Sequence, residues 1–286
     1  MIINGLSVDI EDWFQVGAFE TTINRADWPT LDCRVERNCD AVLALFDAAG
    51  VKGTFFTLGW VAERYPALIK RIVAGGHELA SHGYDHARVF TLTANQFAAD
   101  LRKSRAILED AGGIAVTGYR APSFSVDPRT PWAHAILAEQ GYAYSSSVAP
   151  VVHDHYGWPD SPRHPWRPLA DSDLIEWPVT TARFAGRSLA AGGGFMRILP
   201  YSVTRWAIAQ TNGEGHPAIL YFHPWEIDPG QPRVTGAPLR SKLRHYSGLS
   251  AMAGKLERML GDFAWGRVDA IVPDLVERAT AWREAA

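Results

Sequence analysis

The chain has 286 residues, of which 47% are hydrophobic and 21% are charged, and its formal net charge is −3. This composition is typical of a globular protein with a large core, and a single α/β barrel commonly reaches this length. The negative charge excludes the electrostatic attraction on which nucleic-acid binding depends, so we expect no nucleic-acid partner. No stretch approaches about 18 uninterrupted apolar residues, so we expect no transmembrane segment.

The cysteines and the first residues bear on the cellular compartment. Cys33 and Cys39 are too few for a disulfide framework, and a separation of six residues in a helix-like stretch places them on different helix faces. We expect both to be reduced. Residues 1–6 run into a strand-like segment without the basic and long apolar regions of a signal peptide. We therefore expect a cytoplasmic protein.

Short apolar strands alternate with amphipathic helices along the chain, and most of these helices stop at a glycine. Such repetition predicts a largely parallel sheet, either open or closed into a barrel. In chain order, the expected strands are Gly5–Val8, Gly53–Leu58, His77–Ala80, Val116–Tyr119, Ala143–Ser145, Leu174–Val179 and Ala218–Phe222. The expected helices are Asp40–Ala49, Tyr65–Ala74, Thr93–Ala111 and Pro131–Glu139, with Thr93 as a helix N-cap.

Two proline-rich stretches, 149–168 and 224–238, interrupt this alternation. A loop as long as the first is uncommon and is often functional, so it either covers a cleft or packs on the surface. Beyond the second stretch, apolar residues at helical spacing between Leu249 and Leu260 predict a further helix packed on the body. Without a repeat or a linker, we expect one domain over residues 1–286, with a helical extension from about residue 240.

Two histidines give the sharpest local signal. His82 and His86 stand in SHGYDH, directly after an expected strand. On a helical turn, residues four apart project from one face, which suits two imidazole ligands of one metal. The alternative is a pair of surface histidines.

An acidic cluster follows the first expected strand. Strand alternation puts Asp9 and Glu11 on one side, and Asp12 turns into the loop. Alone, such a cluster is better explained as a solvated loop that caps a helix. Together with two histidines, it completes a ligand set that leaves metal positions open.

Asp9, His82, Arg120 and His223 all stand at the C-terminal ends of expected strands. Taken singly, Arg120 could form a structural salt bridge and His223 could be a core histidine. In a parallel barrel, however, these strand ends converge on one rim, where active sites are built. We therefore expect one shared site.

These residues resemble the motifs of a known family. Ser7-Val8-Asp9, the segment GHELASHGYDH, Arg120-Ala121-Pro122 and Phe222-His223 are similar, in this order, to the motifs of NodB-homology polysaccharide deacetylases, also called carbohydrate esterase family 4. The similarity extends from residue 5 to about 225. Three further segments, FFTLGWVAERYP, GGGFMRILPY and YFHPWEIDPGQPR, resemble the subgroup found in exopolysaccharide loci beside exosortase-type export systems.

The resemblance implies a distorted (β/α)7 barrel and a divalent metal, commonly Zn²⁺, although Co²⁺ or Fe²⁺ would also suit the ligands. By resemblance, His82 and His86 are metal ligands, Asp9 is the general base, Arg120 orients that base and His223 is the general acid. Substrate-binding residues are expected at Pro122, Ser123, Phe124 and Trp225.

The family's aromatic residue after Arg-x-Pro is displaced here to Phe124, behind Ser123, and the chain departs from the family pattern in two further places. The family has two adjacent aspartates, base and then ligand, but here Ile10 follows Asp9. The third ligand is then Glu11, favoured by strand alternation, or Asp12, favoured by loop geometry and by the family's short aspartate ligand. The family's aspartate that tethers the arginine is also missing, and Ser145 is expected to replace it.

The implied function is metal-dependent removal of N-acetyl groups from amino sugars of a polysaccharide or its precursor, in exopolysaccharide biosynthesis. This role leaves room for association with a membrane-bound polysaccharide assembly system. Two alternatives remain: a non-catalytic sugar-binding barrel, suggested by the two departures, and a metal-free amide or ureide hydrolase on the same fold. Retention of His82 and His86 argues against the second.

Overall fold

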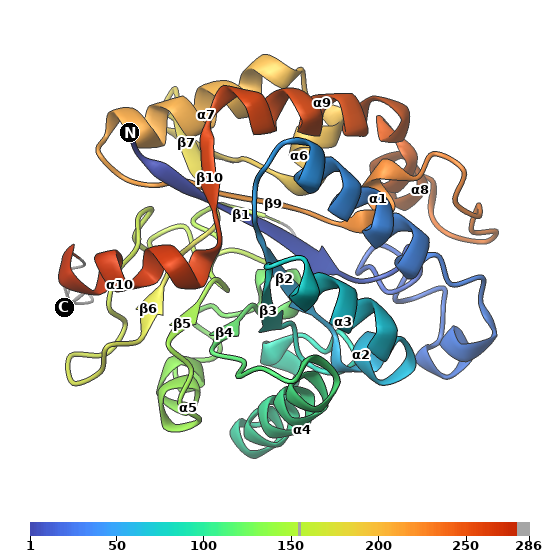
Figure 1. Ribbon diagram of the computed structural model, residues 1–286, viewed down its shortest axis with the longest axis horizontal. Coiled ribbons are helices and arrows are strands. Elements are labelled where there is room, and N and C mark those ends of the chain that lie inside the picture. Colours follow the sequence, from blue (N-terminus) through green and yellow to red (C-terminus); the bar gives the residue numbers. More distant parts are fainter. Residues whose placement is uncertain (154–155, 279–286) are drawn as a thin grey trace.

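Eight parallel strands form the central sheet of the computed structural model, which describes residues 1–153 and 156–278 (Figure 1). One edge of the first strand, β1, pairs with β2, and the sheet continues in the order β3, β4, β5 and β6. The other edge of β1 pairs with β10 and, further along, with β9. These strands are β1 (Ile3–Ile10), β2 (Thr54–Thr57), β3 (Glu78–Ser81), β4 (Gly118–Tyr119), β5 (Tyr144–Ser145), β6 (Ile175–Glu176), β9 (Ile219–Phe222) and β10 (Ala264–Gly266).

Helices surround this sheet, and a separate antiparallel hairpin of β7 (Thr181–Phe184) and β8 (Arg187–Ala190) packs beside α7. The α-helices are α1 (Val35–Ala48), α2 (Gly59–Arg64), α3 (Pro66–Ala74), α4 (Ala94–Gly112), α5 (Ala133–Glu139), α6 (Gly193–Ile198), α7 (Tyr201–Gly213), α8 (Leu239–Tyr246), α9 (Leu249–Asp262) and α10 (Val268–Arg278). Short 3-10 turns are η1 (Arg25–Thr30), η2 (Val89–Thr91), η3 (Pro122–Phe124) and η4 (Pro224–Ile227). Among the described residues, no helix is long and apolar enough to cross a membrane.

The sheet curls into a partly closed barrel, which confirms the expected distorted (β/α)7 architecture. Where β6 and β9 face each other, the Thr180 side chain bridges the wall: its Oγ1 donates to the Ile219 carbonyl (2.9 Å) and accepts from the Ile219 N–H (2.7 Å). The hydroxyl therefore makes hydrogen bonds where β6 and β9 do not pair through their backbones.

The side chains of β1 alternate between the core outside the barrel and its interior. Leu6, Val8 and Ile10 pack outward in the main core, so Ser7 and Asp9 face inward. A second apolar cluster fills the interior at the amino ends of the strands. Val268, Val272 and Leu275 of α10 belong to this cluster. Asp9 lies beyond this cluster at the carboxyl end of β1, whereas the buried Thr54 and Glu78, which share a hydrogen bond (2.5 Å), lie at the amino ends of β2 and β3.

All seven expected strands and all the expected helices are present, with shifted ends. Thr93 caps α4 together with Gln96, as predicted. Both cysteines are free. The sequence did not predict the β7–β8 hairpin, β10, or the helices α2, α6 and α7, because their short or weakly apolar patterns depend on long-range packing.

Candidate active site

The expected strand ends converge on one cleft. Asp9 ends the inward-facing row of β1, His82 follows β3, Arg120 follows β4 and His223 follows β9. The cleft has a volume of about 880 Å³. Residues that line it include Asp9, Glu11, His82, His86, Ser123, Phe124, Tyr221, His223 and Trp225.

Glu11, His82 and His86 form a buried cluster whose candidate ligand atoms all lie within 4.8 Å of one another. Glu11 Oε2 is 2.8 Å from His86 Nε2, yet this buried oxygen receives no hydrogen bond of acceptable geometry. The Nδ1 atom of His82 lies 2.9 Å from the Arg120 carbonyl, which leaves Nε2 for the cluster. A carboxylate and two imidazoles fit a divalent transition metal.

The protonation states of these residues also suit a cation. Burial opposes the charge on Glu11, but the neighbouring imidazoles of His86 and His223 outweigh it and lower the pKa of Glu11 to about 2. Burial lowers the pKa of His82 to about 4, so its imidazole is neutral near pH 7. A charged carboxylate and a neutral imidazole are the forms that bind metals.

His82 and His86 come together without a helix, contrary to the helical turn expected from their spacing. The segment after Ser81 is a loop in which Gly83 (φ 74°) and His86 (φ 61°) have left-handed backbones. The N–H of Gly59, at the start of α2, donates to the Gly83 carbonyl (2.8 Å). The imidazole centroids are 5.6 Å apart.

Asp12 lies outside this cluster, so the geometry does not support it as a metal ligand. Its Oδ2 accepts the backbone N–H groups of Arg34 (2.5 Å) and Val35 (2.9 Å), and its Oδ1 accepts that of Trp13 (2.8 Å). These bonds satisfy the free N–H groups at the start of α1 and hold the carboxylate there. Of the two alternatives, the structure brings only Glu11 to the histidines.

Asp9 forms an ion pair with a fully buried arginine. Arg120 Nη1 is 2.6 Å from Asp9 Oδ1, and the guanidinium carbon lies 4.1 Å from the Phe56 ring centroid. The other N–H groups of Arg120 donate to the carbonyl (3.2 Å) and the hydroxyl (3.0 Å) of Ser146. Ser146 therefore holds the arginine, and the expectation that Ser145 does so is wrong: the Ser145 hydroxyl bonds instead to Ser147.

His223 lies between three carboxylates. Its Nδ1 is 3.0 Å from Glu226 Oε2, whereas its Nε2 faces Glu11 Oε1 (3.4 Å) and Asp9 Oδ2 (3.9 Å). Burial opposes a charge on the imidazole, but the carboxylates of Glu11, Glu226 and Asp9 outweigh it and raise the pKa of His223 to about 9. The imidazole is therefore charged at neutral pH, with Nε2 directed toward Asp9 and Glu11.

The sequence analysis missed Glu226 and Arg197. Arg197 Nε donates to Glu226 Oε1 (2.9 Å), and its other nitrogens donate to the carbonyls of Arg244 (2.7 Å) and His245 (2.7 Å). Burial would raise the pKa of Glu226, but His223 and Arg197 hold it at about 2. A carboxylate three residues after a strand-end histidine was the available signal for Glu226; nothing local marks Arg197.

Of the four residues expected to bind substrate, three line the cleft and Pro122 does not. Ser123 (φ 55°) and Phe124 (φ 50°) line the cleft with left-handed backbones, a strain that clusters at functional sites. Pro122 is buried and is not among the residues that line the cleft. Trp225 is 5% exposed and stacks between His223 (5.2 Å) and His245 (4.3 Å), and its indole N–H donates to Glu11 Oε1 (3.2 Å). Trp225 therefore supports the cluster and also lines the cleft.

Comparison with known proteins agrees with this geometry. Residues 22–145 match the family described as polysaccharide deacetylase, and residues 146–273 match a domain of unknown function, DUF3473. Residues 22–145 thus belong to a polysaccharide deacetylase domain. Its site draws on both matched segments and on β1: His82, His86 and Arg120 lie in the first, whereas His223, Glu226 and Arg197 lie in the second.

A peptidoglycan deacetylase of Helicobacter pylori is 34% identical over 107 residues, which cover 37% of this chain and 36% of the relative. A peptidoglycan-N-acetylglucosamine deacetylase of Bacillus cereus is 35% identical over 72 residues, which cover 25% of this chain and 26% of the relative. The chain thus matches between about a quarter and a third of the length of these curated relatives.

The polysaccharide deacetylase fold is also found by structural comparison. A crystal structure from Mycobacterium smegmatis, provisionally named a polysaccharide deacetylase, superimposes with a TM-score of 0.66 and 19% sequence identity. The match covers 99% of this chain and 93% of that one. At this identity, the likeness shows the fold alone.

Proposed function

We propose that this chain is a metal-dependent deacetylase that removes N-acetyl groups from amino sugars of a polysaccharide or its precursor. The observation that carries the proposal is the buried cluster of Glu11, His82 and His86, whose candidate ligand atoms all lie within 4.8 Å of one another. An anionic oxygen buried in this way is costly unless a cation lies against it. The names of the relatives, which act on peptidoglycan, favour an amino-sugar substrate.

Glu11, His82 and His86 would hold the metal, and we propose Zn²⁺, with Co²⁺ or Fe²⁺ as alternatives. When bound, such a metal polarises a carbonyl and lowers the pKa of a coordinated water.

Asp9 is the proposed general base. Its Oδ1 is occupied by Arg120, so Oδ2 is the oxygen available to accept the proton of the attacking water. The buried guanidinium keeps Asp9 in a fixed orientation.

His223 is the proposed general acid. Its Nδ1 is occupied by Glu226, so the Nε2 proton is the one that the departing amine would receive. Its Nε2 lies 3.9 Å from Asp9 Oδ2, so the proposed acid and the proposed base face the same point of the cleft. General acid–base hydrolysis of an amide needs two such groups beside the reacting bond.

We further propose a role in exopolysaccharide biosynthesis in the cytoplasm. The support is the resemblance of three segments to the exosortase-locus subgroup. Two of these segments build the site: GGGFMRILPY supplies Arg197, and YFHPWEIDPGQPR supplies His223, Trp225 and Glu226.

Two contacts argue against a non-catalytic sugar-binding barrel. Glu11 lies where the displaced first motif lacked a ligand, and Ser146 holds Arg120 where the tethering aspartate is missing. A metal-free hydrolase would not need the oxygen of Glu11 buried against His86.

The test is acetate release from N-acetylglucosamine oligomers and from native exopolysaccharide, with and without a chelator. We expect release that stops on chelation and returns with Zn²⁺ or Co²⁺. About one metal ion per chain should be lost in His82→Ala but retained in His153→Ala, a control histidine on the same cleft. Release that survives full metal removal contradicts the metal mechanism, and metal binding without release from either substrate supports the sugar-binding barrel.

A further inference from the structure

Helix α8 presents its apolar side chains outward. Leu239 is 73% exposed and Leu243 is 59% exposed, and the two lie one turn apart on the same face. The opposite face is anchored: His245 is buried, stacks on Trp225 (4.3 Å) and contacts the Phe19 ring (4.6 Å). Single exposed leucines are ordinary, but two adjacent ones on a short helix fixed by its other face form an apolar surface.

Basic residues flank this apolar surface. At about 100° per residue, Arg240 and Lys242 fall on either side of the two leucines. The segment 229–248 also contains Arg233 and Arg244 and has no aspartate or glutamate, although the net charge of the chain is −3. The cations are thus concentrated around the exposed leucines.

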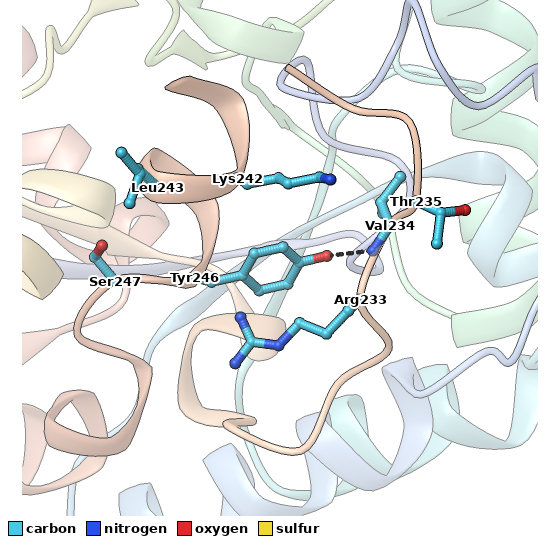
Figure 2. Close-up of a pocket in the computed structure, with 7 residues that line it drawn as sticks. All are labelled: Arg233, Val234, Thr235, Lys242, Leu243, Tyr246 and Ser247. Carbon is cyan, nitrogen blue, oxygen red and sulfur yellow. Dashed lines mark hydrogen bonds between the residues drawn. The ribbon is translucent and has the colours of Figure 1, made fainter. Parts of the chain in front are cut away.

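A shallow pocket of about 390 Å³ lies between α8 and the loop before it (Figure 2). Arg233 and Lys242 line it together with Thr235 and Ser247. The loop is fixed to the helix by Tyr246, whose hydroxyl accepts from the Val234 N–H (2.8 Å) and donates to the Pro232 carbonyl (3.0 Å). Two cations at a fixed pocket suit the phosphate of a lipid headgroup.

We propose that α8 and the loop 229–238 dock the protein on an anionic phospholipid surface, with Leu239 and Leu243 at the boundary of the acyl chains and Arg233 and Lys242 on headgroup phosphates. Apolar residues flanked by Lys and Arg on an exposed helix are typical of interfacial membrane binding. A soluble acidic polymer would use the cations but would leave the leucines without a function. A membrane surface uses both.

The same helix borders the catalytic cleft. Arg240, Ser241 and Arg244 line that cleft, as do the exposed Val152 (88%) and Ile198 (50%). Docking through α8 therefore places the cleft beside the lipid surface. If the proposed function holds, on which this step rests, the substrate is a chain attached to a membrane lipid. The docking surface also gives a role to part of the segment matched by the domain of unknown function.

The experiment is flotation of the full chain with vesicles of phosphatidylcholine alone or with phosphatidylglycerol added. We expect binding that requires phosphatidylglycerol and weakens with salt. Leu239→Ser with Leu243→Ser, and separately Arg233→Gln with Lys242→Gln, should each weaken the partition coefficient about tenfold or more. The matched control is Phe184→Ser, which removes a 69% exposed aromatic side chain on β7 and should leave binding unchanged.

Three results would overturn the proposal. The wild type fails to bind anionic vesicles, both double variants bind as tightly as the wild type, or the Phe184→Ser control loses as much binding as the double variants. Binding to polygalacturonate without binding to vesicles would assign the surface to an acidic polymer. A dimer dispersed by the leucine variants, again without vesicle binding, would assign it to a second copy of the chain. Acetate release from soluble oligomers is measured in parallel and should not change in these variants. If the wild type releases no acetate, that result refutes the proposed function and leaves the docking proposal to the vesicle experiment.

Discussion

Replacing Glu226 with glutamine tests how the acid of the site is kept charged. The carboxylate of Glu226 accepts the Nδ1 proton of His223 (3.0 Å) and is the largest influence after Glu11 that raises the pKa of the imidazole. When a metal shares the charge of Glu11, Glu226 is the carboxylate that remains hydrogen-bonded to the imidazole. A hydrogen bond to a charged group contributes about 1.5–3 kcal/mol, and 1.36 kcal/mol corresponds to about one pKa unit. Glu226→Gln should therefore lower the pKa of His223 by about one to two units.

Loss of the Glu226 carboxylate should reduce activity at alkaline pH. The carboxylate favours the charged imidazole, so its loss lets the acid deprotonate at lower pH. The alkaline limb of the kcat/KM profile should move down by about one to two pH units, while the acid limb and the metal content stay unchanged. The assay is acetate release against pH. The matched control is Glu20→Gln, which removes an exposed carboxylate of the same cleft and should leave both limbs in place.

Glu226→Gln also leaves the buried Arg197 without its carboxylate, which costs up to about 3–5 kcal/mol of stability. Thermal unfolding should therefore accompany the profile. If the variant is too unstable for kinetics, the pKa of His223 can be measured by NMR titration of its imidazole in the folded fraction. An alkaline limb that stays in place while the variant is folded and metal-loaded would refute the role of Glu226.

The remaining predictions concern the base, the metal ligand and one buried histidine. Asp9→Asn should reduce kcat by at least about 10²-fold with metal content unchanged, and turnover near the wild-type rate would exclude Asp9 as the base. Glu11→Gln should abolish stoichiometric metal binding, whereas Asp12→Ala should retain the metal and lower the free energy of unfolding by about 1–2 kcal/mol, measured with urea; the reverse pattern would make Asp12 the ligand. Burial lowers the pKa of His245 to about 3 from 6.5, so the unfolded chain binds its proton first and stability falls as the pH drops from 6.5 toward 3. His245→Phe, which can still stack on Trp225, should lose less stability than the wild type between about pH 7 and pH 5; an equal loss would contradict this assignment.

The strand ends could be predicted because each one is encoded locally. A buried apolar strand followed by a polar residue marks where the chain leaves the barrel, and this was enough to place Asp9, Arg120 and His223 in one cleft. The histidine pair was found for an incorrect reason. His86 adopts a left-handed backbone in a loop, a conformation that spacing alone does not predict.

The supporting residues could not be predicted because their partners are distant in the sequence. Arg197 meets Glu226 across 29 residues, and Ser146 meets Arg120 across 26. Each of these side chains would be an ordinary surface group in another fold. Only the packed structure shows that they are buried and which charges they balance.

The displaced first motif is compensated by a longer side chain and a new partner. The resemblance leads one to expect an aspartate ligand directly after Asp9, but Ile10 fills that position and its side chain packs outward in the core. Strand alternation returns the next residue, Glu11, to the inner side, one position further from the barrel. Its additional methylene lets the carboxylate reach His86 (2.8 Å), and the indole N–H of Trp225 fixes the second oxygen (3.2 Å). Because Trp225 follows His223 by two residues, the segment that supplies the proposed acid also orients Glu11, so the displaced ligand and the acid are linked through η4.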